Sequence, residues 1–102
     1  MAKKRARLVP VHPGEILREE IMAPLQLSVN GLARALRVPA TRIGHIVCER
    51  RAITADTALR LGRYFGTSAE LWINMQAHYD LEIARDRLEA RINRTVQQRK
   101  AA

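Results

Sequence analysis

Two short apolar stripes with helical spacing, separated by only about three residues, constrain this chain more than any other feature. The first stripe consists of Val29, Leu32, Ala33 and Leu36, and the second of Ile43, Ile46 and Val47. Spacings of three and four residues place such side chains on one face of a helix. A link as short as residues 37–39 makes the two helices cross steeply and leaves the second one protruding. Residues 28–48 are therefore predicted to form a helix-turn-helix.

The rest of the chain is also predicted to be helical. Aromatic residues make up only 4% of the 102 residues, and helix-favouring Ala, Leu, Arg and Glu dominate. A first helix is expected to open at His12-Pro13-Gly14-Glu15 and to stop before Pro24. Ser28 is a candidate N-cap for the second helix. The expected fold class is all-α, with five helices.

The last two helices have recognisable start and stop signals. Thr54 or Asp56 is expected to cap the fourth helix, which should end at Gly66. Residues 67–70 have the pattern of a capping box, with an acid three residues after the hydroxyl of Thr67. The fifth helix is expected to continue from there without a break beyond Arg91.

Positive charge is concentrated around the two stripes. The chain has 18 Lys and Arg against 10 Asp and Glu, a formal net charge of +8. Residues 28–51 contain one acid, Glu49, and five arginines: Arg34, Arg37, Arg42, Arg50 and Arg51. Such a balance favours an anionic partner, of which nucleic acid is the commonest. The main alternative is an ordinary pair of packed helices in a protein-interaction bundle.

The second helix of the pair carries small or polar side chains on its predicted outer face. These are Ala40, Thr41, Arg42, Gly44, His45 and Glu49. A helix with so lean a face fits the major groove of DNA. Arg42 is expected to bind guanine in a bidentate manner, to contact only phosphate or to be solvated. His45 is expected to contact a base edge, to act as a pH switch, to contact phosphate or to be simply exposed.

Several classes of function lack the residues they require. No nucleophile–base pair, paired carboxylates or Gly-rich phosphate loop is recognisable, so we expect neither an enzyme nor a cofactor. His12, His45 and His78 lack metal-ligand spacing, so no metal is expected. The single cysteine, Cys48, suits a reducing compartment and is expected to be packed. No apolar run approaches membrane-spanning length, and a cytoplasmic location is expected.

Four segments of the sequence resemble HigA-type antitoxins (virulence-associated protein I), within the Cro/phage-repressor class of helix-turn-helix proteins. The resemblance extends over residues 12–88. It is carried by HPGEIL (12–17), the corner from Leu32-Ala33 to Val38, ITADTALRL (53–61) and GTSAELWINMQ (66–76). The last segment is the most specific, because small domains of this class vary after the fourth helix.

The resemblance implies a five-helix, lambda-repressor-like domain that is usually dimeric and binds a palindromic DNA operator. It further implies a toxin partner with a RelE-like ribonuclease fold that cuts ribosome-bound mRNA, and repression of the pair's own operon. The alternative is a stand-alone repressor without a toxin. From the chain's own residues we expect a flexible basic arm (1–11) and a frayed basic tail (93–102) on either side of the DNA-binding domain (12–92).

The family's site residues correspond to named positions of this chain. The implied recognition helix comprises residues 39–48, with Ala40, Thr41 and His45 at base-reading positions and Arg42 beside them. Ser28 and Val29 match the helix start whose backbone amides meet a phosphate, and Arg34, Arg50 and Arg51 are further phosphate-binding candidates. The chain departs from the family in starting this helix with Pro39-Ala40 and in lacking Asn-Gly in the loop after it, which leaves that loop's conformation open.

The fifth helix carries two apolar stripes. Trp72, Met75 and Tyr79 are expected to be core or dimer contacts. Leu81, Ala84, Leu88 and Ile92 form a second stripe that too little of the domain remains to cover. We therefore expect Leu81, Leu88 and Ile92 to pack against a second chain or against the toxin.

Overall fold

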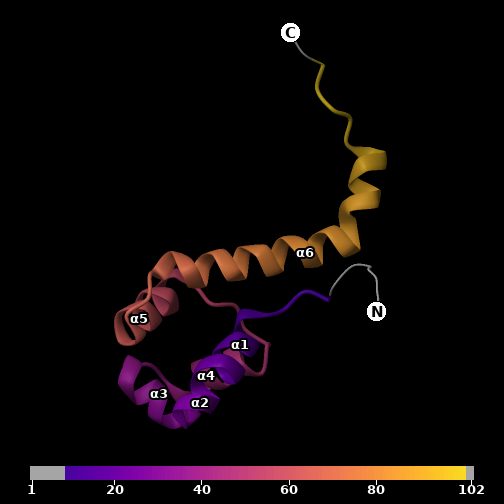
Figure 1. The fold of residues 1–102 in the computed structure, drawn as a ribbon. Coiled ribbons are helices and arrows are strands. Elements are labelled where there is room, and N and C mark those ends of the chain that lie inside the picture. The colour runs from indigo at the N-terminus through magenta and orange to yellow at the C-terminus, as the bar shows by residue number, and fades with distance from the viewer. Residues whose placement is uncertain (1–8, 101–102) are drawn as a thin grey trace.

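The computed structural model describes residues 9–100, which form helices and contain no strand (Figure 1). The elements are α1 (Pro13–Ile16), the π-helical η1 (Leu17–Met22), α2 (Ala23–Leu25), α3 (Val29–Leu36), α4 (Ala40–Val47), α5 (Ala55–Phe65) and α6 (Ala69–Thr95). Because α1, η1 and α2 follow one another without a gap, the described chain has five helical bodies. The predicted all-α, five-helix fold is confirmed. Most of the predicted basic arm, residues 1–8, lies outside the described residues.

The first helical body does not stop before Pro24, so that prediction is wrong. Pro24 lies in the first turn of α2, after the wider π-helical turns of η1. A proline is tolerated in the first turn of a helix because its missing N–H is not needed there. The body ends at Gln26, which has a left-handed φ of 56°, and the next N–H, of Leu27, donates to Met22 O at 2.9 Å. This turn directs the chain into α3.

Short polar side chains begin the later helices. Ser28 Oγ accepts the Gly31 N–H at 2.9 Å, and Thr54 caps α5, as predicted. Gly66, with φ 74°, ends α5. The predicted capping box is wrong by one residue, because Ser68 Oγ accepts the Leu71 N–H at 3.1 Å. Thr67 Oγ1 instead accepts the indole N–H of Trp72 at 3.0 Å.

The core gathers the apolar stripes of all five helical bodies. Its largest fully buried side chains include Trp72, Leu17, Leu32, Ile43, Ile46 and Leu61. Trp72 is 0% exposed, so it belongs to the core of the single chain. Its prediction as a dimer or partner contact is therefore wrong, and the core alternative holds. Because α5 packs against α6, it covers the large apolar indole within the single chain.

Helix α6 continues well past the packed part of the molecule. It runs unbroken over 27 residues, as predicted, and its far end changes direction and leads away from the other helices (Figure 1). Residues 85–100 are all exposed. The predicted tail boundary at residue 93 is wrong, because the helix continues to Thr95, whose hydroxyl donates to Arg91 O at 2.9 Å. No helix within residues 9–100 combines the length and the apolar character that crossing a membrane requires.

Candidate nucleic-acid interface

Helices α3 and α4 meet across a tight turn that contains no glycine. Arg37 adopts a left-handed φ of 61°, and the Val38 N–H donates to Ala33 O at 3.0 Å. Pro39, in extended conformation, is the N-cap of α4. These hydrogen bonds satisfy the last carbonyls of α3 while the chain reverses. The predicted helix-turn-helix is confirmed, with its second helix at Ala40–Val47.

A glycine in the first helix lets α1 lie directly against α4. A Cβ added at Gly14 would lie 1.8 Å from Ile46 O, much closer than two non-bonded atoms can approach. Only a residue without a side chain allows this contact. The glycine in HPGEIL is thus required by a tertiary contact. The sequence pattern alone did not reveal this contact, because it joins residues 32 positions apart.

His12 is the N-cap of the same helix, α1. Its Nδ1 accepts the Gly14 N–H at 2.8 Å, and its ring packs edge-on against Tyr79 with centroids 4.8 Å apart. Burial lowers the pKa of His12 below 6.5, while Glu49 and Asp80 act in the opposite direction. The neutral imidazole is therefore the form that the fold favours.

An arginine from η1 contacts the same C-terminal end of α4. Arg18 Nη1 donates to Val47 O, in the last turn of α4, and lies 3.6 Å from a Glu49 carboxylate oxygen. A cation at a helix C-terminus satisfies a free carbonyl and interacts favourably with the helix dipole. The last turn of α4 is thus held against the first helical body by two neighbouring contacts.

The loop after α4 closes in the same way as the turn before it. Glu49 has a left-handed φ of 63°, and the Arg50 N–H donates to His45 O at 2.9 Å. Further along, the buried Gln76 Oε1 accepts the Ile53 N–H at 2.9 Å, while its Nε2 donates to Asp80. The loop is therefore ordered without the Asn-Gly of the family. The role of Gln76 could not be predicted from the sequence, since its partner lies 23 residues away.

Not every residue predicted on the outer face of α4 lies there. Thr41 and His45 are exposed, whereas Ala40 is half-buried against the core. Gly44 faces α3, where an added Cβ would be 3.9 Å from a Val29 methyl group. Arg42 turns towards α5 instead of projecting outward. The outer-face prediction is therefore wrong for Gly44 and Arg42, because each contacts a neighbouring helix. It holds only in part for the half-buried Ala40.

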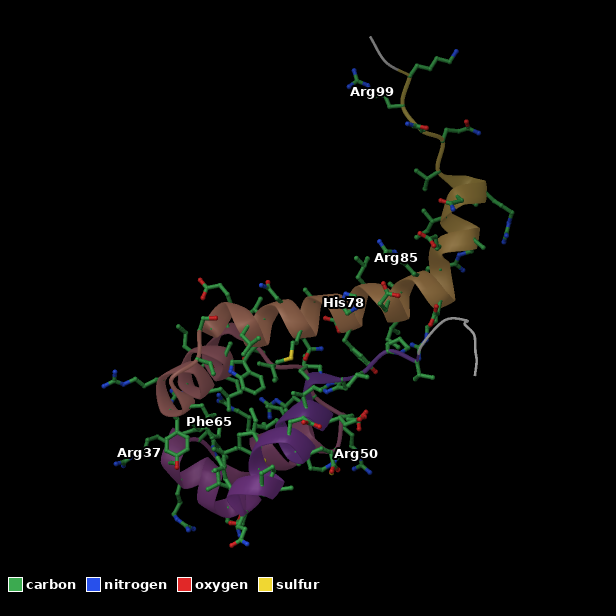
Figure 2. All side chains as sticks on the ribbon, in the orientation of Figure 1. Arg37, Arg50, Phe65, His78, Arg85 and Arg99 are labelled. Carbon is green, nitrogen blue, oxygen red and sulfur yellow. The ribbon has the colours of Figure 1, made fainter. Side chains whose placement is uncertain are left out.

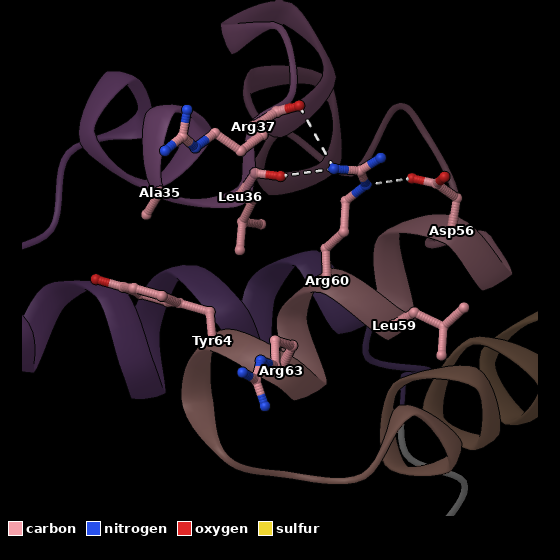
Figure 3. A pocket seen from close by; sticks show the side chains of 8 residues that line it. All are labelled: Ala35, Leu36, Arg37, Asp56, Leu59, Arg60, Arg63 and Tyr64. Carbon is pink, nitrogen blue, oxygen red and sulfur yellow. Dashed lines mark hydrogen bonds and ion pairs between the residues drawn. The ribbon is translucent and has the colours of Figure 1, made fainter.

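Arg42 belongs to a chain of ionic contacts between α4 and α5. Its Nη1 donates to Asp56 Oδ1 at 2.7 Å and lies 3.5 Å from Thr57 Oγ1. Arg60 Nε donates to the same Asp56 oxygen at 2.7 Å, and its Nη1 donates to Leu36 O at 2.9 Å (Figure 3). Hydrogen bonds from Arg60 and Arg42 hold the pKa of Asp56 below its ordinary value. We call Arg42, Asp56 and Arg60 the brace.

The predicted phosphate-binding residues are not all grouped together. Ser28 is exposed at the start of α3, and Val29 is half-buried, so only its backbone N–H is accessible to a ligand. Arg50 and Arg51 are exposed after α4, and Arg50 lies on the side of the pair away from Arg37 (Figure 2). Arg34 lies in a surface hollow with Arg37, Val38 and Tyr64. The structure thus brings Arg50 next to α4 and leaves Arg34 on another face.

The predicted partner contacts on α6 divide by depth. Met75 and Tyr79 are half-buried within the single chain, Met75 against the core and Tyr79 against His12. Leu81, Leu88 and Ile92 are 51%, 37% and 45% exposed. These three apolar side chains are therefore left uncovered by the single chain.

Two further expectations concern metals and the cysteine. Among residues 9–100, no group of three or more His, Cys, Asp or Glu side chains is placed to hold a metal ion. Cys48 is exposed, so its prediction as a packed residue is wrong. As the C-cap of α4, it lies one residue past the apolar stripe.

Known proteins are similar to this chain in both sequence and fold. No family model matches the chain. Virulence-associated protein I of Dichelobacter nodosus is 61% identical over 74 residues, which cover 72% of this chain and 68% of the relative. Antitoxin HigA of Pseudomonas aeruginosa, solved with the higBA promoter, is 46% identical with a TM-score of 0.84, covering 86% of this chain and 96% of its own. Antitoxin GraA, solved in complex with its operator, is 40% identical with a TM-score of 0.87, covering 99% of this chain and 100% of its own.

Fold, turn geometry and relatives agree on the class of protein. The α3–α4 pair, joined by a tight turn within five helical bodies, defines a helix-turn-helix regulator of the phage-repressor type. Within that class, the chain belongs to the HigA/virulence-associated protein I family of antitoxins.

Proposed function

We propose that this protein is the DNA-binding antitoxin of a type II toxin–antitoxin pair, which represses its own operon and neutralises a RelE-like, mRNA-cleaving toxin. The observation that carries the proposal is that neighbouring elements hold α4 in place and leave part of its surface exposed. Gly14 and Arg18 contact it from one side, Arg42 reaches α5, and Thr41 and His45 are left exposed. Relatives solved with promoter or operator DNA support the same reading.

Roles on the DNA follow from exposure and charge. In this proposal, α4 enters the major groove, and Thr41 and His45 contact base edges, with Ala40 allowing close approach. The backbone N–H groups at the start of α3, at Ser28 and Val29, meet one phosphate. Arg50 and Arg51 contact the backbone beyond α4, and Arg34 is the more distant candidate. Most of the affinity then comes from phosphates and the sequence preference from a few side chains.

A homodimer completes the proposed function. Leu81, Leu88 and Ile92 are spaced by seven and four residues on the unpacked part of α6. Covering this stripe with the same stripe of a second copy removes apolar surface from water. A two-fold dimer would bind a palindromic operator, with half-sites about one helical turn apart.

The DNA part of the proposal is tested by footprinting on the DNA that precedes this chain's own gene. The expected result is one protected inverted repeat, with centres of protection about 34–36 Å apart along the duplex. A single asymmetric protected site would contradict the dimeric arrangement. Uniform protection along the whole duplex would contradict sequence-specific binding.

The toxin part is tested by co-expression with the neighbouring short reading frame. The expected result is growth arrest by that frame alone, with cleaved mRNA, and rescue when this chain is also produced. If no adjacent frame arrests growth while the footprint is present, the protein is the alternative, a stand-alone repressor.

A further inference from the structure

The brace places an arginine of the recognition helix on an acid of the next helix. Arg42 is the third residue of α4, yet its side chain is only 25% exposed, and its guanidinium contacts Asp56 at 2.7 Å. An unrestrained arginine at this position would be a strong phosphate ligand. The structure therefore keeps this cation paired internally beside the proposed DNA surface.

A second arginine fixes the acid in place. Arg60 contacts the same Asp56 oxygen at 2.7 Å, and its Nη1 donates to Leu36 O and lies 3.5 Å from Arg37 O (Figure 3). These two carbonyls lie at the C-terminal end of α3. The brace thus joins α3, α4 and α5 through one carboxylate. Asp56 also lies in the first turn of α5, where the helix dipole favours a negative charge.

We propose that Asp56 is a positioning residue that sets the sequence specificity of α4, because it holds Arg42 as a strut between α4 and α5 and withholds this cation from phosphates. The inference rests on the proposed DNA-binding function. A fixed α4 matters for base contacts, which need a defined side-chain position, and matters little for loose phosphate contacts. Loss of the strut should therefore affect promoter DNA and random DNA differently.

The competing possibility is that Arg42 leaves Asp56 on operator DNA and contacts a base. In that case the ion pair opposes binding to the operator. Removing the acid would then raise affinity for the operator at least as much as affinity for random DNA. The two possibilities predict opposite changes in the ratio of the two affinities, so one variant separates them.

The central variant is Asp56→Asn, measured with a duplex from the region preceding this chain's gene and with a scrambled duplex of equal composition. We expect about two- to fivefold tighter binding to the scrambled duplex, in proportion to a partly exposed ion pair. The plot of log affinity against log salt should steepen by about one for that duplex, because one phosphate contact is added. The promoter-to-scrambled ratio should fall.

Glu70→Gln is the matched control. Glu70 occupies the same second position of α6 that Asp56 occupies in α5, and residues 9–100 contain no ion pair of Glu70. This variant removes the same charge without freeing an arginine. Its promoter-to-scrambled ratio and its salt slope should equal those of the wild type.

Arg42→Gln tests the same ion pair by removing its other partner. It still gives an answer if Asp56→Asn proves too unstable to measure. It removes the strut without freeing a cation, so the ratio should fall through weaker promoter binding alone. A flatter salt slope on the scrambled duplex would overturn the inference, since Arg42 would then already contact phosphate in the wild type. A rise of the ratio in Asp56→Asn, or no change in either variant, would overturn it too. If the wild type itself does not distinguish the two duplexes, the proposed function fails instead.

Discussion

At the scale of single residues, the placement of α4 depends on the missing side chain of Gly14. A Cβ there would lie 1.8 Å from Ile46 O. Gly14→Ala should therefore separate α1 from α4 and lower the free energy of unfolding by about 1–3 kcal/mol, the usual range for overpacking. Urea denaturation measures the change.

Gly44→Ala is the control for this substitution. Gly44 lies inside α4, and an added Cβ would be 3.9 Å from Val29, an ordinary contact. Because alanine favours the helix, this variant should be neutral or more stable by up to about 1 kcal/mol. Equal destabilisation by both substitutions would refute the proposed reason for Gly14.

The buried imidazole of His12 makes stability depend on pH. Nδ1 must be unprotonated to accept the Gly14 N–H, and burial lowers the pKa of His12 below 6.5. The unfolded chain therefore binds more protons than the folded chain as the pH falls below 6.5. The stabilisation is complete above pH 6.5 and decreases below it, until the pH passes the folded-state pKa.

The measurement is the free energy of unfolding from pH 7.5 down to about pH 5. The wild type and His78→Gln, which alters an exposed ring, should lose stability in parallel. His12→Asn should lose less, because an amide can still cap the helix without titrating there. Identical slopes for His12→Asn and the wild type would contradict the assignment.

At the scale of elements, three helical bodies end in left-handed residues that are not glycine: Gln26, Arg37 and Glu49. Arg37→Gly should raise the free energy of unfolding by about 0.5–1 kcal/mol, because glycine adopts this conformation without the Cβ penalty. Arg34→Gly removes the same charge from within α3 and should lower it by about 1 kcal/mol. Thermal denaturation of the two variants should thus show shifts of opposite sign. Shifts of the same sign would contradict this account of the turn.

Local signals predicted the elements well, and long-range contacts explain most of what they missed. Spacing of the stripes and the caps Ser28 and Thr54 were sufficient to predict α3, α4 and α5. Pro24 misled because the π-helical turns of η1 place it at a new helix start. The capping box was placed at Thr67, whose hydroxyl instead accepts the indole N–H of Trp72. Each error arises where a tertiary contact or an irregular turn competes with a local rule.

The candidate site was predicted in outline, and its support was not. Thr41 and His45 are exposed on α4 as expected, since a helical period alone places them opposite the stripe. The roles of Gly14, Arg18 and Gln76 could not be predicted, because each contacts a segment more than 20 residues away. The pairing of Arg42 with Asp56 likewise depends on where the fold places the first turn of α5, 14 residues along the chain.

At the scale of the whole molecule, the proposed homodimer depends on the unpacked half of α6. Leu81→Lys combined with Leu88→Lys should convert a dimer to a monomer without loss of helix content, since both side chains are exposed in the single chain. Leu25→Lys combined with Leu59→Lys, at side chains 60% and 64% exposed elsewhere, is the control and should remain dimeric. Sedimentation equilibrium gives the masses. A monomeric wild type at micromolar concentration would contradict the proposed interface.

The most direct test of DNA binding is the ratio of affinities for the promoter duplex and a scrambled duplex, measured at one salt concentration for three chains. The wild type should bind the promoter at least about a thousandfold more tightly than the scrambled duplex. Thr41→Ala combined with His45→Ala should lower this ratio while leaving affinity for the scrambled duplex within about twofold. Arg50→Ala should weaken binding to both duplexes alike. A wild-type ratio near one, or an unchanged ratio in the Thr41–His45 double variant, would contradict α4 as the reading element.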